Sequence, residues 1–135
     1  MNLFLDTNVL LDMFLARDDG EAKEIFESII RDETLNAYIS DITVINTYYI
    51  ISKYSTKANA IGAVKLIRNH CGLSFAREDV IDMATGSQFE DFEDGVQYFC
   101  AKSVNSDYII TNNKDDFKKS DINVCTPKEW INKSK

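Results

Sequence analysis

Short apolar segments alternate with longer amphipathic segments along the whole chain. The first comprises Leu3, Phe4 and Leu5, with no polar residue between them, which is typical of a strand buried on both faces. Comparable segments predict strands at residues 35–39, 73–75, 108–111 and 122–124. Between them, apolar residues recur at helical spacing, at residues 8–17, 22–30, 41–54, 56–70, 77–85 and 91–101. A last helix is predicted to begin at Thr126, an N-cap residue that is followed by proline.

This alternation predicts a single α/β domain over residues 1–135. We expect three layers, α/β/α, with helices on both faces of a central parallel sheet of about five strands. Strands one to three should lie side by side, and strands four and five should follow beyond strand one. The strand order then reverses between strands one and four. Ligands of open α/β sheets bind at the carboxyl ends of the strands beside such a reversal.

The apolar stripes also predict which helix faces are buried. On the second helix the stripe comprises Ala22, Ile25, Phe26, Ile29 and Ile30. On the third helix it comprises Ile42, Ile45, Tyr48 and Tyr49. We expect both stripes to face the interior, whereas the charged face of the second helix should be solvated. Asn46 interrupts the third helix, where it either satisfies a backbone group or belongs to a site.

The composition, with 44% hydrophobic and 27% charged residues, is ordinary for a soluble globular protein. No apolar run approaches the roughly 20 residues that span a membrane, and the N-terminus does not resemble a signal peptide, so we expect a cytoplasmic protein without membrane contact. The three cysteines include no Cys-x-x-Cys pair and are predicted to be core residues. The single histidine, His70, is expected at the end of a helix and argues against a histidine-based metal site or a catalytic triad.

The net charge of the chain is −7. Such a charge argues against nucleic-acid binding, because contacts to phosphates need cations. This objection weakens if several acids gather around a divalent metal. In addition, lysines cluster late in the chain and make its C-terminal region mildly basic: Lys114, Lys118, Lys119, Lys128, Lys133 and Lys135.

Acidic residues occur where the predicted sheet would bring them together. Asp6 ends the first strand, although it is also a suitable N-cap for the helix that follows. Asp91 and Asp94 lie three residues apart at a helix start. There, acids suit the helix dipole, but like charges on one face are costly unless a cation or strong donors lie between them. Asp116 follows strand four, in a polar segment that would equally form a loop.

Clustered carboxylates without histidine or cysteine suit a hard cation such as Mg²⁺ or Mn²⁺, which prefers oxygen ligands. A metal of this kind can activate water and stabilise negative charge on a phosphodiester. The chain contains no glycine-rich phosphate loop, which argues against enzymes that use a nucleotide cofactor.

Five segments, taken in order, resemble a PIN domain, and the resemblance runs along essentially the whole chain. They are residues 5–11 (LDTNVLL), 39–40 with the following helix, 91–94 (DFED), 108–117 (YIITNNKDDF) and 126–130 (TPKEW). The family comprises metal-dependent ribonucleases, including the VapC-type toxins of toxin–antitoxin pairs. The resemblance implies an endoribonuclease that uses Mg²⁺ or Mn²⁺ to hydrolyse single-stranded RNA, with an antitoxin protein as partner and a homodimeric assembly.

The resemblance also implies the residues of the site. The four acid positions of the family fall on Asp6, Asn46, Asp94 and Asn113. Implied catalytic residues are Asp6, Asp94 and Asn113; implied metal ligands are Asp6, Asp94, Asp91 and Asp116; implied supporting residues are Asn8, Ser40, Asn46 and Thr111. Two of the four acid positions thus hold amides, which can orient a metal-bound water but bring no charge. We therefore expect a lowered affinity for the metal.

A second function, from a different class, follows from the same residues. It is a PIN-like protein with weak or absent catalysis that binds RNA or a protein partner. The acidic average charge and the two asparagines favour this hypothesis, whereas Asp6, Asp91, Asp94 and Asp116 favour the ribonuclease. A third hypothesis, a phospho-acceptor domain with Asp6 as nucleophile, fits poorly because it needs a paired acid near Asp6 and a lysine at a strand end.

Overall fold

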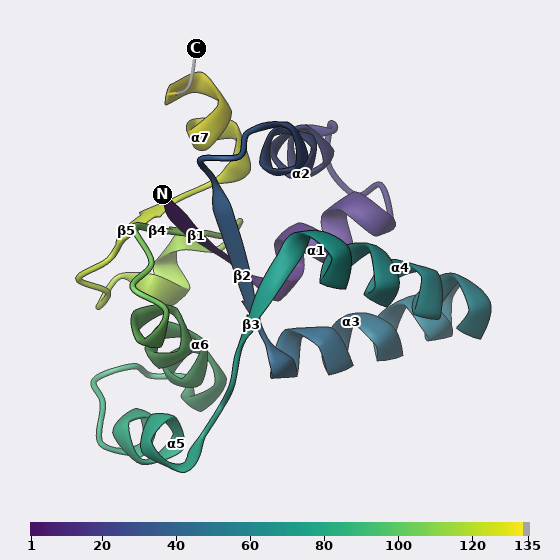
Figure 1. Cartoon of the computed structure of the whole chain (residues 1–135). Coiled ribbons are helices and arrows are strands. Elements are labelled where there is room, and N and C mark those ends of the chain that lie inside the picture. The colour runs from purple at the N-terminus through teal and green to yellow at the C-terminus, as the bar shows by residue number, and fades with distance from the viewer. Residues whose placement is uncertain (134–135) are drawn as a thin grey trace.

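A parallel sheet of five strands runs through the computed structural model, which describes residues 1–133 (Figure 1). The strand order is β3-β2-β1-β4-β5. The strands are β1 (Asn2–Leu5), β2 (Asn36–Ser40), β3 (Cys71–Ser74), β4 (Tyr108–Ile110) and β5 (Asn123–Cys125). This order confirms the predicted reversal between strands one and four, because β1 pairs with β2 on one side and with β4 on the other.

Helices cover both faces of the sheet and complete the predicted α/β/α layers. They are α1 (Thr7–Phe14), α2 (Glu21–Arg31), α3 (Asp41–Tyr54), α4 (Lys57–His70), α5 (Glu78–Thr85), α6 (Phe92–Ser103), the 3-10 helix η1 (Lys114–Phe117) and α7 (Pro127–Lys133). Residues of α1, α2, α4 and α7 form the core on one face, whereas residues of α5, α6 and η1 form the core on the other (Figure 1).

The central strand β1 is buried on both faces, as its unbroken apolar sequence predicted. Successive side chains of a strand point to opposite faces, so Leu3 and Leu5 join one core and Phe4 joins the other. All three side chains are fully buried. The strand stays paired to its end, where the N–H of Asp6 donates to the carbonyl of Ile110 at 3.0 Å. The carboxyl ends of β1 and β4 are therefore held side by side.

The first helix ends earlier than predicted, at Phe14 rather than near Arg17. Ala16 adopts a left-handed backbone with φ 51°, and the N–H of Arg17 donates to the carbonyl of Asp12 at 3.0 Å. The left-handed residue and this bond together end the helix in the way that a glycine C-cap normally does, although the left-handed residue here is an alanine. The side chain of Arg17 also pairs with the carboxylate of Asp12 at 3.1 Å.

The predicted buried faces of two helices were partly wrong. On α2, Ile30 is exposed although the rest of its stripe is buried. On α3 the error is larger, because Ile45 and Tyr49 are 57% and 68% exposed, whereas the buried residues are Thr43, Thr47 and Ile51. Thr43 meets polar partners in the interior, and Ile51 joins an apolar cluster with residues of α1 and α4. Both contacts agree with an orientation in which Ile45 and Tyr49 face outward.

The predicted environment of the cysteines is confirmed. All three are free thiols in the interior, and burial raises the pKa of Cys71 to about 12 and those of Cys100 and Cys125 to about 11. In the part of the chain that the structure describes, no helix has the length and apolar character needed to cross a membrane.

The last helix offers a test of the local structure. Thr126 and Glu129 cap α7 reciprocally: the N–H of Glu129 donates to the Thr126 hydroxyl at 3.1 Å, and the N–H of Thr126 donates to the Glu129 carboxylate at 2.9 Å. Replacing Thr126 with alanine should lower the free energy of unfolding by about 1 kcal/mol, as measured by urea denaturation. Thr126→Ser keeps the hydroxyl and should unfold at nearly the wild-type urea concentration. An equal loss in both variants would contradict the capping role.

Candidate metal centre

The carboxylate of Asp6 lies at the carboxyl end of β1, where the N-terminus of α1 begins. The N–H of Thr7 donates to its Oδ1 at 2.8 Å. The hydroxyl of Thr111, which follows β4, donates to its Oδ2 at 2.8 Å, and Nδ2 of Asn8 donates to the same oxygen at 3.1 Å. Asp6 is only 9% exposed. Three donors from two segments therefore fix the position and orientation of a buried carboxylate.

The surroundings of Asp6 nevertheless disfavour its charge. Burial is the largest influence and raises the pKa of Asp6 above its ordinary value. Hydrogen bonds from Thr111 and Thr7 act in the opposite direction, while the charges of Asp116 and Glu93 raise the pKa further. A nearby cation would relieve both the burial cost and the repulsion.

A second perturbed carboxylate comes from the start of α6. Partial burial, followed by the charges of Asp116, Asp91, Asp6 and Glu93, raises the pKa of Asp94 to about 7. The carboxylate of Asp91 serves as N-cap of α6 and accepts from the N–H of Asp94 at 3.0 Å. Two of these charges, Asp6 and Asp116, come from distant segments, whereas Asp91 and Glu93 are neighbours of Asp94 in the chain.

The predicted supporting residues differ in what they contact. Asn8 bonds Asp6 directly, and its Oδ1 accepts from the N–H of Asn112 at 3.3 Å. Thr111 bonds Asp6 and also accepts from the N–H of Asn113 at 3.0 Å. Asn113 takes part through its backbone, since its carbonyl accepts from the N–H of Asp116 at 3.1 Å. These contacts place Asn113 at the mouth of the site, where its side chain is exposed.

Ser40 does not contact Asp6 but is linked to the residue beside it through Thr43. Its hydroxyl caps α3 by accepting from the N–H of Thr43 at 3.1 Å and lies 3.2 Å from the Thr43 hydroxyl. The Thr43 hydroxyl contacts that of Thr7 at 2.8 Å and accepts from Nε2 of Gln97 at 3.1 Å. This buried network joins α1, α3 and α6 behind the acids. In the sequence, only the predicted N-cap at the start of the third helix pointed to this network.

The donor set suits a hydrated hard cation. Within residues 1–133, no three acidic, histidine or cysteine side chains converge closely enough to enclose a metal ion by themselves. Mg²⁺ usually keeps several waters and binds through one or two carboxylates, and Mn²⁺ accepts similar oxygen ligands. The charge of Asp6 raises the pKa of Asp94, and the charge of Asp116 raises the pKa of both carboxylates.

Comparison with known proteins identifies the family. The family model described as PIN domain matches residues 2–115. The chain belongs to the PIN domain family. It is 28% identical over 134 residues to Ribonuclease VapC1 of Aquifex aeolicus (strain VF5), an alignment that covers 95% of this chain and 92% of the relative.

Solved structures share the PIN fold of this chain. A toxin–antitoxin complex from Klebsiella pneumoniae contains a chain with a TM-score of 0.72 and 22% identity, covering 93% of this chain and 97% of its own. VapBC-1 from nontypeable Haemophilus influenzae matches with a TM-score of 0.69 and 17% identity, covering 95% and 99%. At these identities, the similarity establishes the fold.

One acid that the residue pattern did not single out influences both Asp6 and Asp94 of this PIN domain. Oε1 of Glu93 accepts a hydrogen bond from Nδ2 of Asn46 at 3.2 Å, and the charge of Glu93 influences both Asp6 and Asp94. Its position between Asp91 and Asp94 was the available signal. No role was predicted for Glu93 itself, because no local pattern shows that α3 approaches the start of α6.

Basic residues border the acids. A cavity of about 200 Å³ beside Asp91, Asp94 and Asp116 is also lined by Lys118 and Lys119. These lysines belong to the late cluster noted in the sequence, so part of the basic region lies next to the acidic centre. A negatively charged polymer could be held by the lysines while one of its phosphates approaches the acids.

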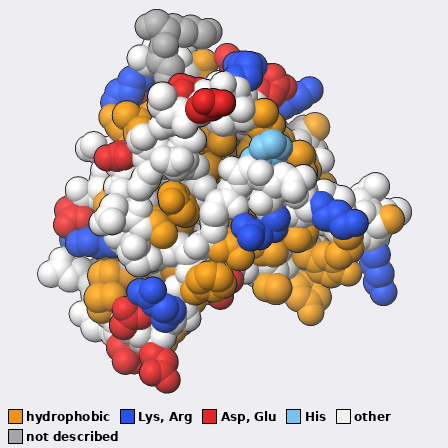
Figure 2. All heavy atoms as spheres, in the orientation of Figure 1, with side chains coloured by type: hydrophobic (Ala, Val, Ile, Leu, Met, Phe, Trp, Pro, Cys, Tyr) orange, Lys and Arg blue, Asp and Glu red, His pale blue; other side chains and the backbone are white. Residues whose placement is uncertain are grey.

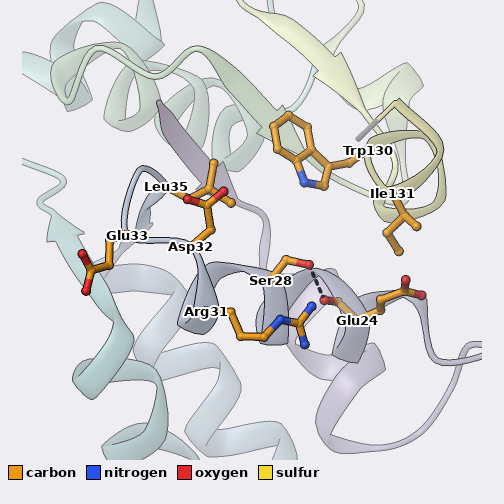
Figure 3. A pocket seen from close by; sticks show the side chains of 8 residues that line it. All are labelled: Glu24, Ser28, Arg31, Asp32, Glu33, Leu35, Trp130 and Ile131. Carbon is orange, nitrogen blue, oxygen red and sulfur yellow. Dashed lines mark hydrogen bonds between the residues drawn. The ribbon is translucent and has the colours of Figure 1, made fainter. Parts of the chain in front are cut away.

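A larger hollow lies elsewhere and has a different lining. It has a volume of about 670 Å³ and lies between α2, the segment that leads into β2, and α7 (Figure 3). Its lining includes Arg31, Leu35 and Trp130. Because residues 31–35 precede β2, this hollow opens at the amino end of that strand, whereas Asp6 lies at the carboxyl end of β1. Size alone therefore does not locate the site in this PIN domain.

The raised pKa of Asp94 predicts how stability depends on pH without metal. Between pH 4 and 7 the folded protein holds this proton more often than the unfolded chain does, so the free energy of unfolding should fall as pH rises through this window. Asp94→Asn should flatten this slope and raise the melting temperature at pH 7.5 by about 2–4 °C. Melting curves in the presence of a chelator measure both effects. The exposed control Asp82→Asn should keep the slope, and an Asp94→Asn protein that melts lower than wild type would contradict crowding of the acids.

Proposed function

We propose that this PIN domain is a metal-dependent endoribonuclease that hydrolyses single-stranded RNA. The observation that carries the proposal is the pair Asp6, at the carboxyl end of β1, and Asp94, in the first turn of α6: the pKa values of both carboxylates are raised, and the charge of Asp6 contributes to the shift of Asp94. Similarity to Ribonuclease VapC1 supports RNA as the substrate. Mg²⁺ or Mn²⁺ fits the oxygen donors.

Each residue of the site would have a separate role in hydrolysis of RNA. Asp6 is held rigidly by its three donors and Asp94 approaches from α6, so together they would hold the cation. The bound cation would supply charge stabilisation for a phosphodiester and lower the pKa of water. Lys118 and Lys119 would hold neighbouring phosphates. Asn113 and Asp116, at the mouth of the site, would orient water toward the phosphate.

We further propose that the protein is the toxin of a toxin–antitoxin pair, acts in the cytoplasm and forms a homodimer. The relatives support the pairing, since one is described as a toxin–antitoxin complex and another as VapBC-1. The surface supports protein contacts: Ile45, Tyr49 and Tyr54 of α3 and Ile61 of α4 are exposed, and apolar side chains gather along this helical hairpin (Figure 2).

A second function is favoured by a specific observation. Asn46 and Asn113 occupy positions where the resemblance implied acids, so the site carries less charge than that resemblance implied. With too little charge to hold a cation, the same crevice would bind RNA or a partner protein without cleaving RNA.

Metal titration and RNA cleavage separate these two functions. Wild type should bind Mn²⁺ by calorimetry and cleave single-stranded RNA. Asp6→Asn should reduce both by at least about 100-fold, because it removes a buried charge at the centre of the site. The control Asp82→Asn changes an exposed acid on α5 and should behave as wild type. A wild-type protein that binds RNA, yet neither binds Mn²⁺ nor cleaves, would establish the second function instead.

A further inference from the structure

We propose that Gln97 is a positioning residue of the site, which acts through the hydroxyls of Thr43 and Thr7 to hold Asp6 in place relative to Asp94. The inference rests on the proposed function and adds to it a residue that lies away from the substrate. Gln97 is only 2% exposed, so its effect on cleavage of RNA has to pass through other residues.

Three hydrogen bonds lead from Gln97 to Asp6. Nε2 of Gln97 donates to the hydroxyl of Thr43 at 3.1 Å, and that hydroxyl contacts the hydroxyl of Thr7 at 2.8 Å. The N–H of Thr7 donates to Oδ1 of Asp6 at 2.8 Å. We call Gln97, Thr43 and Thr7 the hydrogen-bond relay. Its members belong to α6, α3 and α1, so the relay joins three helices behind the site.

The hydroxyl of Thr43 has all of its hydrogen-bonding capacity in use. A hydroxyl can donate one hydrogen bond and accept two. That of Thr43 accepts from Gln97 and from the hydroxyl of Ser40, which lies at 3.2 Å, so its own hydrogen is left for Thr7. Thr43 and Ser40 are fully buried, so water does not compete for these bonds. Removing the amide of Gln97 therefore takes away one of the three partners that fix this hydroxyl.

The two ends of the relay lie beside the two principal carboxylates. Thr7 directly follows Asp6 in the chain, and Gln97 lies three residues after Asp94 on the same face of α6. The relay thus connects the start of α1 with the first turns of α6. It thereby sets how far apart the two carboxylates are held, and small displacements of such groups are costly to a reaction.

Stability alone explains the amide of Gln97 poorly. Within residues 1–133, its Oε1 is buried and has no hydrogen-bond partner. A buried carbonyl without a partner destabilises the folded state, whereas an apolar side chain of the same length would not carry this cost. If Gln97 served only to pack α6 against α3, the amide would bring little benefit. What the amide provides is the bond from Nε2 to Thr43.

Gln97→Met tests the positioning role, because methionine has a similar length and no amide. The affinity for Mn²⁺, measured by calorimetry, and the kcat for cleavage of single-stranded RNA should each fall about tenfold, as is typical when a residue that orients a ligand is lost. KM for RNA should stay unchanged, because Lys118 and Lys119 are untouched. The melting temperature should stay within about 3 °C of wild type, since loss of the bond and removal of the unpaired carbonyl offset each other.

A matched control uses the other glutamine of the chain. Gln88 is exposed, so Gln88→Met makes the same chemical change outside the relay and should leave kcat and Mn²⁺ affinity unchanged. Val80→Ala, on α5, shortens a buried side chain of the core on the same face of the sheet. It should lower the melting temperature while kcat at 25 °C stays at the wild-type value.

Variants of Thr43 test whether the effect passes through the relay. Thr43→Val removes the hydroxyl and should lower kcat about as much as Gln97→Met, whereas Thr43→Ser keeps the hydroxyl and should retain most of the wild-type kcat. The double variant Gln97→Met, Thr43→Val should lose no more than the weaker of the two single variants, because both changes interrupt one connection. Independent, multiplying losses would overturn the relay.

Three outcomes of these measurements would overturn the proposal. The first is a Gln97→Met protein with wild-type kcat and Mn²⁺ affinity, whatever its melting temperature. The second is an equal loss of kcat in Gln97→Met and Val80→Ala, because the loss would then follow from lowered stability. The third is a Thr43→Val protein that cleaves as well as Thr43→Ser.

Hydrogen exchange at the N–H of Thr7 separates this inference from the function on which it rests. Measured by NMR in the presence of a chelator, exchange should be about tenfold faster in Gln97→Met than in wild type, because the start of α1 opens more often. A wild type that neither binds Mn²⁺ nor cleaves RNA overturns the ribonuclease, and faster exchange in Gln97→Met would still support the hold of Gln97 on Asp6. Unchanged exchange at Thr7 overturns the relay.

Discussion

Burial of β1 between two helical layers is the constraint on which the rest of the structure depends. Leu3 and Leu5 anchor one layer and Phe4 the other, so the strand cannot shift by one residue without exchanging its cores. Its pairing with β4 extends as far as the N–H of Asp6. The position of the central carboxylate is thus set by hydrophobic packing of β1 together with its backbone pairing to β4.

The acids impose a cost on the metal-free protein that the fold only partly offsets. Three donors stabilise the charge of Asp6, yet burial and neighbouring charges still raise its pKa. Asp94 is in the same position, with a pKa raised to about 7. Such crowding is typical of sites built for an external charge, since the repulsion that weakens the empty protein strengthens binding of a cation.

The buried polar residues of α3 fix how this helix lies against α1 and α6. Thr43 is buried because it meets Ser40, Thr7 and Gln97, and this turns Ile45 and Tyr49 outward. The same orientation brings Asn46 to Glu93. The orientation of α3 therefore leaves apolar side chains at the surface and joins this helix to the start of α6.

The sequence by itself determined the layers, the strand order and the segments that carry Asp6, Asp94 and Asp116, because burial of whole strands leaves continuous apolar runs and the reversal of the order fixes where their ends meet. It did not determine the orientation of α3 or the pairing of Asn46 with Glu93. These depend on contacts between residues far apart in the chain. Local periodicity contains no record of such partners, so only the tertiary structure could decide them.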